Sequence, residues 1–67
     1  MADEIDLKPL RQWIHDLNNR VGVILNSSEL LLLEQLSPKA TDRTRTIETK
    51  ALEVRDLLRN MADHYLS

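Results

Sequence analysis

The sequence predicts an all-α protein: an antiparallel two-helix hairpin that homodimerises into a four-helix bundle. Apolar residues recur at alternating spacings of three and four along two long segments, which is the pattern of helices that pack side by side. Helix-breaking residues are scarce, because the chain has one glycine and two prolines in 67 residues. It has no cysteine, which excludes disulfides and cysteine-ligated metal sites. A chain this short then depends on helix packing and association for stability.

The first helix is expected over residues 7–36. Asp6 stands at its start and can accept a hydrogen bond from a free amide of the first turn, as N-cap residues do. Pro9 then falls within that first turn, where proline is tolerated because an unbonded nitrogen is already expected there.

The second helix is expected over residues 38–65. Ser37 and Pro38 together resemble an N-cap followed by the first helical position. The turn, about residues 37–39, is so short that the two helices must be antiparallel neighbours. The whole chain, residues 1–67, is therefore predicted to form a single domain.

The apolar spacing also predicts which side chains face each other. In an antiparallel hairpin the residue numbers of facing pairs add to a constant, and the turn and the apolar pattern indicate the same constant. The expected facing pairs are Leu10–Tyr65, Ile14–Met61, Leu17–Leu58, Val21–Val54 and Ile24–Ala51.

More apolar residues lie beside this seam than one hairpin can bury. Leaving a large apolar side chain in water costs about 1.5–3 kcal/mol. Two hairpins that pair face to face would cover these residues, and this is why a homodimer is expected. The flanking set is Trp13, Leu25, Leu32, Leu33, Leu36, Leu52, Leu57, Ala62 and Leu66.

The composition argues against several classes of function. The chain has 9 Lys and Arg against 11 Asp and Glu, a net charge of −2, whereas nucleic-acid-binding domains usually have a basic surplus. No apolar run is long enough for a transmembrane helix. The acidic start, Met1-Ala2-Asp3-Glu4, is unlike a secretory signal. We therefore expect a cytoplasmic protein with neither a nucleic-acid nor a membrane partner.

One stretch of the first helix departs from ordinary helix composition. Asn18 and Asn19 are poor helix formers, because their side chains compete for backbone hydrogen bonds, and Gly22 follows within one turn. Together they cost about 1–2 kcal/mol relative to alanine. Local rules are broken most often at functional sites, so this stretch is the candidate site. The alternatives are solvent-facing amides at Asn18 and Asn19, and either neutral drift or a close-packing role at Gly22.

The candidate site is centred on His15. Asn19 lies one turn later on the same face of the helix, and Arg11 and Gln12 lie one turn earlier. A histidine can act as a nucleophile, and a guanidinium beside it can bind the charge of a phosphoryl group. A solvated surface histidine is the alternative interpretation.

The segment IHDLNNRVGVILNSSELL resembles the H-box of the dimerisation and histidine-phosphotransfer (HisKA or DHp) domain of bacterial two-component sensor histidine kinases. The family motif is His-(Glu/Asp)-x-x-(Asn/Thr) on a helix, matched here by His15, Asp16 and Asn19. The segment IETKALEVRDLLRNMA is similar to the partner helix of that domain. The resemblance covers roughly residues 8–63.

The resemblance implies a role for each motif residue. His15 would exchange a phosphoryl group with the aspartate of a response-regulator receiver domain. Asp16 would assist the transfer, and Asn19 would position water for dephosphorylation.

Residues near the motif are expected to contact the partner. Arg59, together with Arg55, falls within about a turn of the level of His15 in the expected pairing, where it would meet the acidic site of a receiver. Ordinary solvated charges are the alternative there. Arg20 stands where relatives often carry an apolar residue. The predicted partner-binding set is Arg11, Gln12, Asn18, Arg20, Gly22 and Arg59.

Kinases of this family continue into an ATP-binding domain with glycine-rich segments, and a chain with one glycine cannot form such a loop. We therefore expect a phosphotransfer module without kinase activity of its own. No metal site and no cofactor are expected, and Mg²⁺ belongs to the receiver. The alternatives are a non-catalytic dimer that binds a receiver or a histidine kinase and modulates signalling, or an excised part of a kinase.

Overall fold

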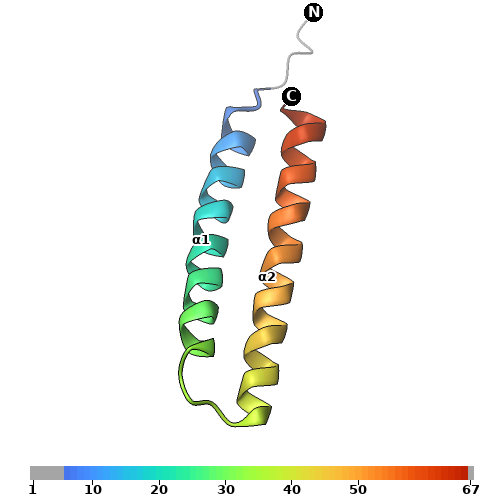
Figure 1. Cartoon of the computed structure of the whole chain (residues 1–67). Coiled ribbons are helices and arrows are strands. Elements are labelled where there is room, and N and C mark those ends of the chain that lie inside the picture. Colours follow the sequence, from blue (N-terminus) through green and yellow to red (C-terminus); the bar gives the residue numbers. More distant parts are fainter. Residues whose placement is uncertain (1–5, 67) are drawn as a thin grey trace, which may run out of the picture.

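The computed structural model describes residues 6–66, which form two α-helices and no strand (Figure 1). Helix α1 spans Lys8–Leu32 and helix α2 spans Pro38–Tyr65. The two helices lie side by side and antiparallel, with the connecting loop at one end of the hairpin (Figure 1). The all-α, two-helix part of the prediction is confirmed. Neither helix is apolar over the length that a membrane span requires.

Helix α2 begins where the sequence predicts. Ser37 has extended backbone angles, and its hydroxyl oxygen accepts a hydrogen bond of 3.1 Å from the amide of Ala40. Pro38 occupies the first helical position, where its missing N–H costs nothing. This cap satisfies one of the free amides at the start of α2.

Helix α1 begins one residue later than expected. Leu7 is the N-cap and contributes no side-chain hydrogen bond. Asp6 still binds the first turn, because its carboxylate accepts a 3.0 Å hydrogen bond from the amide of Lys8. Pro9 lies in the first turn as predicted.

Helix α1 ends at Leu32 rather than at residue 36, so the expected turn at 37–39 is wrong. The last turn tightens, with the amide of Leu33 bonded to the carbonyl of Leu30 at 3.2 Å. Residues 33–37 form the loop. A helix reaching residue 36 would leave only Ser37 to reverse the chain, and a residue before proline avoids the helical region.

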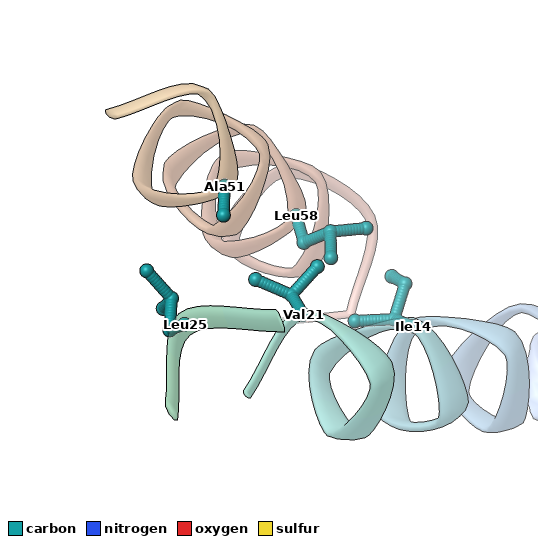
Figure 2. Close-up of a cluster of buried hydrophobic side chains, with 5 residues drawn as sticks. All are labelled: Ile14, Val21, Leu25, Ala51 and Leu58. Atoms are coloured by element: carbon teal, nitrogen blue, oxygen red, sulfur yellow. The ribbon is translucent and has the colours of Figure 1, made fainter. Parts of the chain in front are cut away.

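The hydrophobic core is a narrow layer between the two helices. Ile14, Val21 and Leu25 of α1 point toward Ala51 and Leu58 of α2 (Figure 2), and each is 4–8% exposed. Partly buried residues extend this layer toward the open end of the hairpin. They are Leu10, Ala62 and Leu66.

Toward the loop the buried layer becomes polar. Ser28 is 2% exposed and Thr44 is 6% exposed. Their hydroxyls donate to carbonyls of their own helices, Ser28 to Ile24 at 2.7 Å and Thr44 to Ala40 at 2.8 Å. Within residues 6–66 every buried side-chain polar atom has a partner, so burial of these hydroxyls is not penalised.

The expected facing pairs are wrong in their phase. Leu17 and Ile24 are each 45% exposed and Val54 is 42% exposed, whereas Leu25, expected beside the seam, is buried. On each helix one column of buried residues repeats every seven residues, and Leu25 is buried beside the column of α1. Each helix packs on one column, so the next apolar column of the heptad pattern, three positions later, lies outside the contact between the two helices. The buried columns are Ile14, Val21 and Ser28 on α1, and Thr44, Ala51 and Leu58 on α2.

We predict that Leu58→Ala lowers the free energy of unfolding by about 2–5 kcal/mol, because it leaves a cavity in the core layer. The matched control is Leu30→Ala, since Leu30 is 56% exposed, and its effect should stay within about 0.5 kcal/mol. Urea unfolding followed by circular dichroism at one fixed protein concentration measures both. Equal effects of the two variants would contradict this core.

Candidate functional site

The hairpin has two faces beside its buried columns. The apolar face carries the residues three positions after each member of the buried columns. A groove lined by Ile24, Ile47 and Val54 shows that both helices turn this face to the same side. The residues one position after each member of the buried columns lie on the opposite side, the polar face. The apolar face is Leu17, Ile24, Leu31, Ile47, Val54 and Met61; the polar face is His15, Gly22, Glu29, Arg45, Leu52 and Arg59.

His15 is exposed on the polar face of α1. The residue before it, Ile14, is 5% exposed in the core. The core therefore fixes the backbone of His15 while the imidazole stays in solvent. A nucleophile on a rigid, accessible position suits attack on a group carried by another protein.

Among the described residues, one side chain lies within hydrogen-bonding range of the His15 ring. The side-chain nitrogen Nδ2 of Asn19 lies 3.4 Å from Nε2 of His15, as their spacing of four residues allows. When Nε2 is unprotonated, the amide of Asn19 donates to it and Nδ1 carries the ring proton. At 3.4 Å this bond is long, so it orients the ring without blocking it.

Asp16 is oriented toward a different partner. Its carboxylate accepts a 2.9 Å hydrogen bond from Nε2 of Gln12, and its backbone carbonyl accepts a 3.1 Å bond from Arg20. The structure therefore brings Asp16 together with Gln12 and Arg20, and His15 together with Asn19. Gln–Asp pairs four residues apart stabilise helices, so the spacing contained a signal for this bond, although Gln12 was expected beside His15.

Cationic side chains lie at the same end of the polar face. Arg59 follows Leu58 as His15 follows Ile14, and the two buried residues lie toward each other in the core (Figure 2). Arg59, Arg55 and Arg11 are all exposed. A partner approaching His15 from this side meets the positive charge of both helices.

Asn18 and Gly22 are also exposed. A Cβ atom built at Gly22 meets nothing within 4 Å, and its φ is not positive. Neither packing among residues 6–66 nor backbone conformation requires glycine at this position. The packing role considered for Gly22 therefore has no contact inside the described hairpin to support it.

Within residues 6–66 no three His, Cys, Asp or Glu side chains come close enough to hold a metal ion. No family model, curated protein or solved structure matches the chain. The functional assignment therefore rests on the geometry of the hairpin and on the resemblance of the His15 segment.

The sequence pattern did not predict the open groove on the apolar face, because Ile24 and Val54 were assigned to the contact between the two helices. Its walls come from both helices, and two of its residues, Val21 and Ala51, also belong to the core. The heptad pattern contained the signal, but it was assigned to the hairpin seam. The groove is lined by Val21, Ile24, Thr46, Ile47, Lys50, Ala51 and Val54.

We predict that Gly22→Ala raises the free energy of unfolding by about 0.5–1 kcal/mol. The added methyl meets open space, and alanine loses less backbone entropy than glycine in a helix. Thermal or urea unfolding of the two proteins at equal concentration measures the change. A destabilised variant would show that Gly22 makes a contact absent from the hairpin itself.

Proposed function

We propose that the hairpin is a histidine phosphotransfer module of a two-component system or phosphorelay. His15 exchanges a phosphoryl group with the aspartate of a response-regulator receiver domain. The observation that carries the proposal is an exposed imidazole on a rigid helix, with the amide of Asn19 at 3.4 Å, inside the segment that resembles an H-box. Exposed arginines on the same face support it, because they complement an acidic receiver site.

The transfer is a displacement at phosphorus. An unprotonated ring nitrogen of His15 attacks the aspartyl phosphate, the N–P bond forms, and the P–O bond to the carboxylate breaks. The carboxylate leaves with the bonding electrons, and the other ring nitrogen releases its proton to water. Arg11 and Arg59 offset the charge of the phosphoryl oxygens, and Mg²⁺ is held by the receiver.

Asp16 and Asn19 keep the roles that the resemblance implies. Asn19 is already beside the ring, where it can orient a water molecule. Asp16 is bonded to Gln12, so assistance by its carboxylate requires this exposed bond to break and the side chain to change rotamer. That change costs little, because net hydrogen-bond energies are about 1 kcal/mol.

The hairpin is proposed to act as a homodimer that forms a four-helix bundle. The six residues of the apolar face repeat every seven residues and are 39–49% exposed. Contiguous apolar surface of this kind marks an interaction site. A second copy on this face continues the core layer, because Val21 and Ala51 already line the groove. His15 remains accessible in such a dimer, since it lies on the opposite face.

A second candidate function is a non-catalytic dimer that binds a receiver or a histidine kinase and modulates signalling. The position of Asp16 favours it, because the acid that would assist transfer is bonded to Gln12 rather than oriented toward His15. Both candidates use the same polar face, and only the first requires the imidazole.

We predict that the protein becomes labelled when mixed with phosphorylated receiver domains and that His15→Gln abolishes this labelling. The label should be lost in acid and stable in base. The matched control is His64→Gln, since His64 is the other histidine and is also exposed; it should label like the unmodified protein.

Labelling that persists in His15→Gln would contradict the phosphotransfer role. Absence of labelling, together with receiver or kinase binding that survives His15→Gln, would leave the non-catalytic candidate.

We predict that replacing Ile24 and Ile47 together by asparagine weakens dimerisation more than about a hundredfold, because each dimer then loses four half-exposed isoleucines from its interface. The matched control replaces Val23 and Leu30 by asparagine; they are 65% and 56% exposed and lie outside the apolar face. Analytical ultracentrifugation measures the dissociation constants. A dimer that tolerates the first pair of substitutions would place the interface elsewhere.

A further inference from the structure

We infer that the apolar face is bordered by a cationic rim, so that pairing of two copies is opposed by like charge and strengthened by anions. The inference rests on the homodimer proposed above and adds how its association is regulated. Two features support the cationic rim: the residues that border the apolar face, and the two-fold symmetry of a dimer formed through that face.

The rim consists of the column directly outside the apolar face on each helix. Every rim residue lies three residues after or four residues before a member of that face, so it borders the face on the helix surface. All seven are exposed. None is a carboxylate, and three are cations, although the whole chain has a net charge of −2. The rim is Trp13, Arg20 and Ser27 on α1, and Arg43, Lys50, Leu57 and His64 on α2.

Arg20 and Lys50 lie at the same level of the hairpin. Lys50 lines the groove directly. Arg20 precedes Val21 and Lys50 precedes Ala51, and both of these buried residues also line the groove. The groove is therefore bordered by one cation on each side.

A second copy brings further cations to the same borders. If the two-fold axis runs along the bundle, α1 neighbours α2 of the second copy, and Arg20 approaches the partner subunit's Lys50. If the axis runs across the bundle, each helix neighbours its own counterpart, and the rim of α1 meets the partner subunit's rim of α1. In either arrangement cationic rims face cationic rims.

Neighbouring groups reduce this charge only in part. Lys50 pairs with Glu53 at 3.2 Å, but both side chains are more than half exposed, and such surface pairs are weak. Arg20 donates to the backbone carbonyl of Asp16, whose carboxylate is bonded to Gln12, so this contact does not pair the charge of Arg20 with a carboxylate. Repulsion between exposed cations falls as salt shortens the range of electrostatic interaction.

The test is the dimer dissociation constant measured by sedimentation equilibrium in about 20 mM and about 300 mM NaCl. Dimerisation should be about three- to tenfold tighter at the higher salt concentration, the size expected from a few exposed like-charge pairs. Sulfate at equal ionic strength should tighten it further, because a divalent anion can bridge two cations.

Two double variants that remove the same charge distinguish repulsion between the rims from the general effect of salt on apolar burial. Arg20→Gln with Lys50→Gln should dimerise more tightly than the unmodified protein at low salt and lose most of the salt response. The control is Lys8→Gln with Arg45→Gln, which removes the same charge from exposed positions on the polar side of the hairpin and should keep the full response.

Dimerisation that weakens with salt, or rim and control variants that behave alike, would overturn the cationic rim and leave the homodimer standing. A protein that stays monomeric at every salt concentration would overturn both the rim and the homodimer. The phosphotransfer role of His15 is judged separately, by labelling.

Discussion

Contact between two buried columns, one on each helix, determines how the rest of the hairpin is arranged. Both columns repeat every seven residues, so they set the rotation of each helix along its whole length. Because Ile14 and Leu58 lie inside, His15 and Arg59 lie in solvent on one side. Because Val21 and Ala51 lie inside, residues three positions later form an open groove on the other side. A rotation of either helix would move the site and the groove together.

The core layer is thin for a chain of this size. Within residues 6–66 five apolar side chains are buried, and no large side chain there is completely shielded from solvent. Two helices without further partners are usually marginal in water. Ser28 and Thr44 weaken the loop end further, because they replace apolar packing with hydroxyls that bond only to their own helices. In the proposed homodimer, burial of the apolar face against a second copy would supply the hydrophobic stabilisation that the isolated hairpin lacks.

Features set by neighbouring residues were predictable, and those set by three-dimensional packing were not. The cap at Ser37 follows from one residue and the proline after it. Burial of Leu25 in place of Ile24 was not predictable, because both fit the heptad pattern and only contact with α2 selects between them. At the site, the spacing of His15 and Asn19 brought them together as expected. Asp16 bonds instead to Gln12, a competing pair of equal spacing.

In the proposed homodimer, the separation of the two faces would allow self-association and partner recognition to act independently. His15 and the groove flank the same buried column from opposite sides, so a second copy seated in the groove leaves the imidazole exposed. Both faces are also bordered by cations, Arg59 beside the site and Lys50 beside the groove. The proposed acidic partner would be attracted to either side, whereas a second copy would be attracted by its apolar face and repelled by its rim. Charge would therefore favour recognition of acidic molecules, and apolar burial would favour self-association.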